Sequence, residues 1–191
     1  MNEFCFILGN GVTRLEVDCK SLLARGTVYG CNRIYQELQP HVLVSTDKPM
    51  SMEIQKSGYS GVLYTRRNCI GPNSLAQELP KQYHEWSSGP AALGLASDTP
   101  ASYLFLVGFD FKGVNNKHNN IYAGTAHYRP ADDKVTYFGN WIDQIKTVLA
   151  RHPTKRVFHV NPLDNFSPNQ FTEPNFETMD LEVFYKMINN S

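Results

Sequence analysis

The polar loop of residues 110–133 carries the side chains that suggest catalysis most directly. It holds His118, Tyr122, His127 and Tyr128, with four asparagines at 115, 116, 119 and 120. A histidine beside a binding site can act as a general base near neutral pH, because its ordinary pKa lies near 6.5. A solvated surface histidine without a catalytic role is the plain alternative for either residue. The loop is therefore a candidate for the segment that carries catalytic residues.

A glycine-rich turn, Gly9-Asn10-Gly11, follows the short apolar run of residues 4–8. Glycine lets the backbone approach a ligand closely, and a helix that starts after such a turn offers N–H groups to an anion. A tight turn that needs glycine for its geometry alone explains the pattern equally well. The dinucleotide fingerprint is incomplete, because Arg14 occupies the last glycine position and Asn32 stands where an acid would bind the ribose.

Ser88-Gly89 precedes a run of small residues that predicts a helix. This helix start could hold a phosphate or a carboxylate, although an ordinary N-cap is the commoner role of such a serine. Other enzyme signatures are missing from the sequence: there is no P-loop, no G-x-S-x-G elbow and no H-E-x-x-H pair. There is also no D-x-D pair, so a metal clamp on a sugar nucleotide diphosphate is not supported.

The elements that would position these residues alternate along the chain. Apolar runs predict strands, and periodic apolar positions predict helices. One helix is predicted after the glycine turn, with Thr13 as its N-cap and Glu16 completing a capping box. The apolar positions of this helix are Leu15, Leu22 and Leu23. This alternation predicts an α/β fold: a doubly wound, mostly parallel sheet with helices on both faces, a Rossmann-like three-layer sandwich with a short lid-like loop at 111–133. The predicted strands are 4–8, 27–30, 42–45, 61–64, 103–107 and 156–160, and the other predicted helices are 91–97, 140–150 and 179–188.

Composition narrows the class of protein. The chain has 191 residues, which suits a single domain over 1–191, and its 41% hydrophobic content is enough for a core. Lys+Arg and Asp+Glu are balanced at 18 each, so a nucleic-acid partner is not expected. There is no apolar run of about 18 residues, and therefore no integral membrane segment is expected. Glu3 and the short first apolar run do not fit a signal peptide, which predicts a cytoplasmic protein. The spacing of the four cysteines disfavours a zinc site and indicates free thiols.

Four segments, in the same order along the chain, resemble motifs of the bacterial sialyltransferases that build lipooligosaccharide caps. Residues 7–13 resemble a G-N-G-P-S strand and turn, and residues 29–35 resemble an R-C-N-x-F-Y segment. Residues 88–96 and 106–111 resemble an S-G helix and a G-I-D-F strand end, and residues 160–162 are similar to a late C-P-N turn. The same motifs occur in a wider group of sialyltransferase-like proteins, including pterin pyrophosphokinase-like members. The resemblance therefore supports the fold more firmly than the reaction.

Enzymes of this family transfer sialic acid from CMP-sialic acid to an acceptor hydroxyl with inversion and need no metal. The resemblance implies that His127, which follows Tyr122-Ala123-Gly124, is the general base. In the family two tyrosines stabilise the leaving phosphate, and the resemblance implies that Tyr122 is one of them. Lys112 stands at the position of the other, where a lysine departs from the family pattern but could stabilise the phosphate as a point charge. The lid is shorter than in the family, and Val12 replaces its proline. The residues expected to bind the nucleotide are Gly9, Asn10, Gly11, Thr13, Asn32, Ser88, Gly89 and Asp110.

The expected function is therefore glycosyl transfer from a CMP-sugar to a glycan or small-molecule acceptor, with neither metal nor cofactor. Two alternatives stay open. One is a phosphoryl or pyrophosphoryl transferase on the same fold, which would need Mg²⁺ and carboxylates such as Asp110 and Asp47. The other is a nucleotide-binding protein without catalysis. The sequence leaves open whether the chain forms a homo-oligomer.

Overall fold

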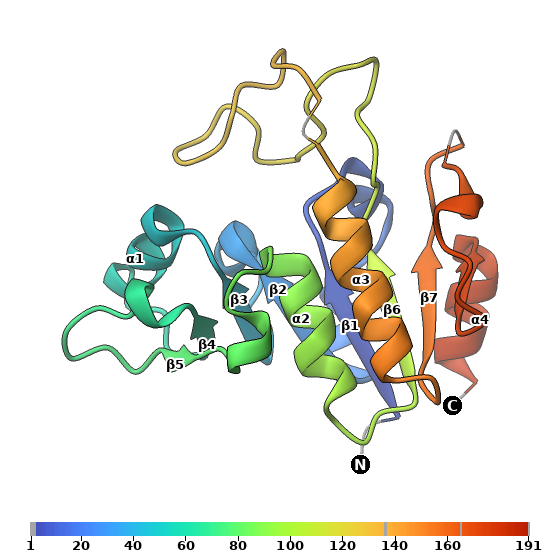
Figure 1. The fold of residues 1–191 in the computed structure, drawn as a ribbon, viewed down its shortest axis with the longest axis horizontal. Helices are drawn as coiled ribbons and strands as arrows, with labels where there is room; N and C mark the ends of the chain where they lie inside the picture. The colour runs from blue at the N-terminus through green and yellow to red at the C-terminus, as the bar shows by residue number, and fades with distance from the viewer. Residues whose placement is uncertain (1–2, 136, 165, 191) are drawn as a thin grey trace.

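The computed structural model describes residues 3–135, 137–164 and 166–190. Its centre is one eight-stranded sheet in which every strand pair is parallel, in the order β5-β4-β3-β2-β1-β6-β7-β8 (Figure 1). The predicted α/β class with a Rossmann-like sheet is confirmed. The strands are β1 Phe4–Leu8, β2 Thr27–Cys31, β3 Val42–Ser45, β4 Val62–Thr65, β5 Gln77–Glu78, β6 Tyr103–Val107, β7 Arg156–Val160 and β8 Phe176–Met179.

Helices cover both faces of the sheet, which gives the expected three layers (Figure 1). The α2 and α3 helices pack on one face, and the η2, η3, α1 and α4 helices pack on the other. The α-helices are α1 Lys48–Lys56, α2 Ser88–Ser97, α3 Gly139–Arg151 and α4 Leu181–Asn189. The short 3₁₀ helices are η1 Val12–Glu16, η2 Ser21–Ala24, η3 Asn32–Gln36, η4 Arg67–Cys69, η5 Lys81–Tyr83 and η6 Pro168–Gln170.

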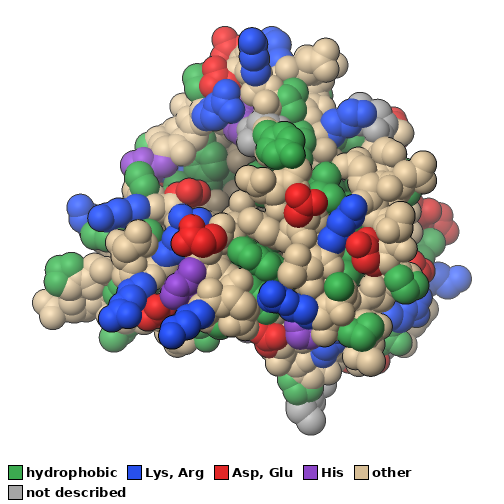
Figure 2. All heavy atoms as spheres, in the orientation of Figure 1, with side chains coloured by type: hydrophobic (Ala, Val, Ile, Leu, Met, Phe, Trp, Pro, Cys, Tyr) green, Lys and Arg blue, Asp and Glu red, His purple; other side chains and the backbone are tan. Residues whose placement is uncertain are grey.

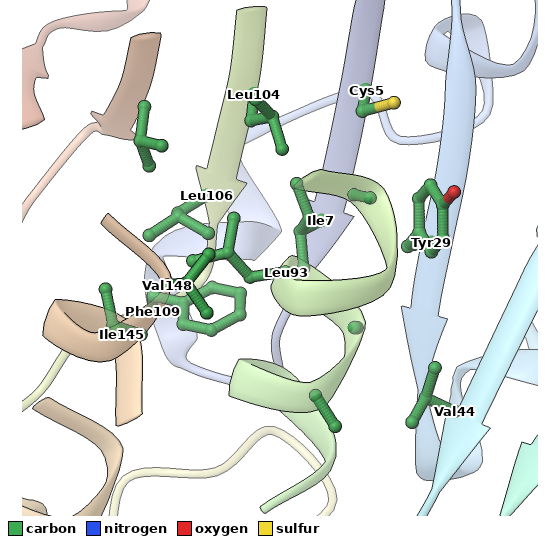
Figure 3. Packing of buried hydrophobic residues seen from close by; sticks show 14 of the residues in the cluster. Cys5, Ile7, Tyr29, Val44, Leu93, Leu104, Leu106, Phe109, Ile145 and Val148 are labelled. Atoms are coloured by element: carbon green, nitrogen blue, oxygen red, sulfur yellow. The ribbon is translucent and has the colours of Figure 1, made fainter. Parts of the chain in front are cut away.

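The core on the α2 side explains why the sequence of α2 is so rich in small residues. Figure 3 shows Leu93 of α2 among Ile7 of β1, Leu106 of β6 and Val148 of α3. A Cβ atom on Gly94 would lie 2.5 Å from the ring of Tyr83, which is closer than van der Waals contact permits. Small side chains therefore let α2 lie against its neighbours, and this packing fixes the helix start that carries Ser88.

The chain reverses its direction of winding between β1 and β6, which are neighbours in the sheet. Parallel sheets bind ligands outside the carboxyl ends of their strands at such a switch point. Here the turn after β1 packs on the turn after β6: Gly9 donates from its N–H to the carbonyl of Val107 at 2.8 Å, and Gly11 to that of Gly108 at 2.9 Å. A Cβ atom on Gly9 would lie 2.6 Å from the Gly108 oxygen. Glycine is therefore required here for the packing of the two turns.

The segment after this turn differs from the prediction of one amphipathic helix. It forms the two 3₁₀ helices η1 and η2, and Gly11, not Thr13, is the N-cap of η1, which has no side-chain cap bond. The Thr13 side chain is instead bonded to Asp110, so a long-range contact replaces the local capping box. Leu15, expected on the buried face, is 71% exposed.

The C-terminal helix begins later than the predicted 179, because Met179 is the last residue of β8. Asp180 is its N-cap and accepts a hydrogen bond from the N–H of Val183 at 2.8 Å. The apolar pattern of the sequence did not indicate α1 or the two outer strands β5 and β8. The strands at 4–8, 103–107 and 156–160 and the helices over 91–97 and 140–150 agree with the structure within a few residues.

The lid-like loop at 111–133 contains no helix or strand, only isolated bridges such as that of Val114 with Lys117. It runs beyond the carboxyl ends of the central strands, at the top of Figure 1. All four cysteines are free thiols. Among the described residues, no helix combines the length and the apolar character that crossing a membrane requires.

Candidate functional site

Asp110, the residue expected to bind nucleotide beyond β6, is turned into the switch point and bonded to the protein itself. Its side chain is buried and accepts hydrogen bonds from the Thr13 hydroxyl, from the Thr13 N–H at 3.4 Å and from Nδ2 of Asn119 at 2.7 Å. The N–H groups at the start of η1 are where a doubly wound fold usually binds an anion. In this structure the protein's own carboxylate takes the Thr13 N–H and hydroxyl.

The lid is bonded to the glycine turn at two points. The N–H of Ile121 donates to the backbone oxygen of Asn10 at 2.9 Å, and the N–H of Val12 donates to Oδ1 of Asn119 at 3.0 Å. Oδ1 of Asn10 is buried and has no hydrogen-bond partner in the part of the chain that the structure describes. A buried acceptor without a donor is unfavourable, so this atom is suited to a donor on a ligand.

Asn32 and Ser88, both expected at the nucleotide, are brought together. The Ser88 hydroxyl donates to Oδ1 of Asn32 at 3.1 Å and accepts from the N–H of Thr46 at 3.0 Å. This cluster of Asn32, Thr46 and Ser88 joins the ends of β2 and β3 to the first turn of α2. Asn32 has a φ of 55°, a left-handed conformation that asparagine adopts more readily than most residues. Gly89 packs against the ring of Phe109, since a Cβ there would lie 2.8 Å from that ring.

His127 forms a pair with Glu53, a residue of α1 that the sequence analysis did not select. Nε2 of His127 lies 3.1 Å from Oε2 of Glu53, and the histidine side chain is 37% exposed. The same carboxylate accepts from Tyr35 at 3.0 Å and from Nη2 of Arg33 at 3.2 Å. With Nε2 donating to the carboxylate, Nδ1 is left as the proton acceptor. A carboxylate in this position orients the ring and fixes which ring nitrogen carries the proton, which is the arrangement of a general base.

Arg33 connects the His127–Glu53 pair to the cluster of Asn32, Thr46 and Ser88. It follows Asn32 directly, its Nη2 donates to the carbonyl of Ala126 at 2.9 Å, and its N–H donates to the Tyr128 hydroxyl at 3.4 Å. The two residues on either side of His127 are therefore both held at the end of β2. Burial raises the pKa of Tyr128 to about 12, so this hydroxyl stays protonated near neutral pH.

Tyr122 is bonded elsewhere, to an ion pair between buried Arg14 and exposed Glu37. Its hydroxyl donates to Glu37 and accepts from Nη2 of Arg14 at 2.9 Å, while Nη2 of Arg14 also lies 3.0 Å from each Glu37 oxygen. The guanidinium lies over the tyrosine ring, 5.4 Å from its centre. Burial, followed by the bond to Glu37, raises the pKa of Tyr122 well above its ordinary value. These contacts hold the middle of the lid against η1 and η3.

Lys112 lies at the base of the lid. It lines a pocket of about 530 Å³ with Gly113, Asn115 and Phe138, at the start of α3. His118 lies further along the lid, where its backbone N–H donates to the carbonyl of Asp133 at 2.9 Å. Burial and then Arg129 lower the pKa of His118 below its ordinary value. The structure thus places His127 beside the end of β2, and the backbone of His118 is bonded within the lid.

Among the described residues, no group of three or more His, Cys, Asp or Glu side chains is arranged to hold a metal ion. The partners that the sequence analysis missed are Glu37, Glu53 and Asn119. Only the resemblance and the loop composition indicated the segment that contains Asn119, and no pattern singled out the two glutamates. Comparisons of the chain with protein-family models, with curated proteins and with solved structures found no match.

Proposed function

We propose that the protein is a metal-independent glycosyltransferase-like enzyme that binds a CMP-sugar and transfers the sugar to an acceptor hydroxyl. The observation that carries the proposal is the His127–Glu53 pair, which is held by Arg33, the residue that follows Asn32. A histidine with a carboxylate partner beside a cluster of polar strand-end groups combines a general base with a binding surface.

The nucleotide in this proposal lies at the switch point, between the glycine turn and the start of α2. Oδ1 of Asn10 offers an unpaired acceptor to it. Asn32 and Ser88 present an amide and a hydroxyl from the neighbouring strand end and helix. Because Asp110 already takes the Thr13 donors, the phosphate is expected away from the start of η1, on the lid side.

In the proposed reaction, Nδ1 of His127 accepts the proton of the acceptor hydroxyl, and Glu53 holds the Nε2 proton. The acceptor oxygen forms a bond to the anomeric carbon, the bond from that carbon to the phosphate oxygen breaks, and CMP leaves with the electron pair. Lys112, at the base of the lid, is the proposed cation for the leaving phosphate. Tyr122 acts in this proposal by holding the lid, since its hydroxyl is bonded to Glu37 and Arg14.

A thermal-shift screen over CMP, CDP, UDP, ATP, S-adenosylmethionine and NAD tests this function. A ligand that binds only the folded state at a hundred times its Kd stabilises it by about 2.7 kcal/mol. CMP is expected to give such a shift with and without EDTA. A shift with ATP only in the presence of Mg²⁺ would favour phosphoryl transfer, and no shift with any nucleotide would overturn the proposal.

Asn32→Asp provides a variant that keeps the fold. Aspartate tolerates the left-handed backbone and can still accept the Ser88 hydrogen bond, but it places a negative charge at the proposed nucleotide site. The matched control is Asn73→Asp, which has a φ of 60° and is exposed in the loop before β5. We expect Asn32→Asp to abolish the CMP shift and Asn73→Asp to retain it.

A further inference from the structure

A second surface pocket, of about 490 Å³, opens beside the carboxyl end of β4. The volume lies within the range of roughly 300–1,000 Å³ that is usual for small-molecule sites. The proposed reaction uses none of its lining residues. They are all polar or charged: Arg66, Arg67, Asn68, His84 and Glu85.

The two arginines give this pocket its chemistry. Nη2 of Arg66 donates to the carbonyl of Trp86 at 3.1 Å, which fixes the guanidinium, while its Nε is buried without a hydrogen-bond partner among the described residues. Arg67 is exposed. Within the described part of the chain, neither arginine forms an ion pair. Two guanidinium groups without carboxylate partners are suited to an oxyanion, which they bind through charge-assisted hydrogen bonds.

The other lining residues favour hydroxyl groups. Nε2 of His84 donates to the carbonyl of Leu79 at 2.6 Å and lies 3.3 Å from Oε1 of Glu78, which leaves Nδ1 for another partner. Glu85 and Asn68 are both exposed, and their oxygens can accept from hydroxyls. The Glu85 carboxylate also repels a densely charged anion. The lining therefore fits one anionic group together with several hydroxyls.

We propose that this pocket binds a hydroxylated small molecule by its anionic group, as a sugar phosphate or a sugar acid would present it. Figure 2 shows Lys/Arg, Asp/Glu and His side chains close together on the left of the visible face, the side that carries α1, β4 and β5 in Figure 1. Arg66 and Arg67 bind the oxyanion, and Asn68, His84 and Glu85 bind hydroxyls.

Residues next to the pocket lining in the sequence lead to the cluster of Asn32, Thr46 and Ser88. The thiol of Cys69 lies 3.9 Å from the carbonyl of Thr46, and Trp86, which holds Arg66, is two residues before Ser88. We assign the pocket to the second substrate, an anionic acceptor. That last assignment rests on the proposed function, whereas the binding of the ligand does not.

Isothermal titration calorimetry on the full chain tests the inference, with glucose 6-phosphate, glucuronate, inorganic phosphate and glucose as probes. We expect glucose 6-phosphate or glucuronate to bind, and the stronger of the two identifies the anionic group. Glucose should not bind, and inorganic phosphate should bind more weakly. Arg67→Gln should raise the Kd at least about tenfold, because it removes a charge-assisted contact. Lys186→Gln, an equal charge change at an exposed position of α4, should leave the Kd unchanged.

Arg67→Gln is chosen because an exposed arginine without a partner has little part in folding, and Arg66→Lys serves as a second variant. If neither sugar ligand binds, or if Arg67→Gln binds as the unaltered protein does, the inference is overturned. Inorganic phosphate binding as tightly as glucose 6-phosphate would also overturn it. A CMP thermal shift on the same preparation separates the two proposals: loss of CMP binding with sugar phosphate binding retained would overturn the proposed function alone.

Discussion

His127 in the lid and Glu53 in α1 form a hydrogen-bonded pair, with 3.1 Å between Nε2 and Oε2. The two residues are far apart in the sequence, and no sequence pattern connects α1 with the lid. The pair is positioned because Arg33 binds Glu53 and the backbone oxygen of Ala126 at once. A single arginine thus connects the candidate base, its carboxylate partner and the end of β2.

The first prediction concerns this pair. His127→Ala is expected to reduce sugar transfer or donor hydrolysis by about a hundredfold or more, because general-base catalysis contributes about 10²–10⁴. The Kd for CMP should change by no more than a few fold, since in the proposed reaction the imidazole contacts the acceptor and not the nucleotide. Steady-state kinetics with CMP titrations measure both. His118→Ala is the control and should keep its activity, and full turnover by His127→Ala would end the catalytic assignment.

The second prediction concerns Asp110. Its carboxylate accepts from Thr13 and Asn119 in a buried position, so Asp110→Ala leaves those donors unpaired. We expect the free energy of unfolding to fall by about 1.5–3 kcal/mol, the range for hydrogen bonds to a charged group. Urea denaturation measures this. Asp143→Ala, at an exposed position of α3, should change stability by less than about 0.5 kcal/mol.

The third prediction concerns the attachment of the lid. Tyr122→Phe removes the hydroxyl that bridges Arg14 and Glu37 but keeps the buried ring. The lid should then open more often, because local opening follows the loss of local contacts. Limited trypsin digestion should cleave within 111–134 several times faster. Tyr137→Phe, whose ring is 76% exposed, is the matched control. Equal cleavage rates in the two variants would show that the hydroxyl does not hold the lid.

The sequence predicted the centre of the sheet well, for a physical reason. Strands buried on both faces read as continuous apolar runs, and both Phe4–Leu8 and Tyr103–Val107 do so. The outer elements were missed because they are only partly buried. Glu177 and Thr178 of β8 are exposed, and α1 carries charged residues at both ends, so neither segment shows a clear apolar pattern.

The sequence allowed only part of the candidate site to be predicted, for a related reason. Residues that follow predicted strands, such as Asn32 and Asp110, could be placed at one edge of the sheet from the order of elements alone. Their partners could not, because the bonds from Asp110 to Thr13 and from His127 to Glu53 join segments that no local pattern connects. The capping box at Thr13 failed for this reason: its local geometry was plausible, but the buried carboxylate of Asp110 competes for the same hydroxyl.

The last prediction concerns His159 of β7, which is fully buried next to the rings of Phe111, Phe166 and Phe176. Burial lowers its pKa from 6.5 to about 4, so the folded protein holds the imidazole neutral. The unfolded chain takes up a proton as the pH falls through 6.5 and the folded chain does not, so this contribution to stability is present above pH 6.5 and is lost as the pH falls toward 4. With about 1.4 kcal/mol for each unit of pKa difference, the loss between pH 7 and pH 4 is about 3 kcal/mol. Urea denaturation at each pH measures the stability of the unaltered protein and of His159→Leu. The difference between the two isolates the contribution of His159, because all other titratable groups are common to both proteins. The unaltered protein should lose about 3 kcal/mol more than the variant over this range, and parallel pH profiles would show that His159 is not held neutral by the fold.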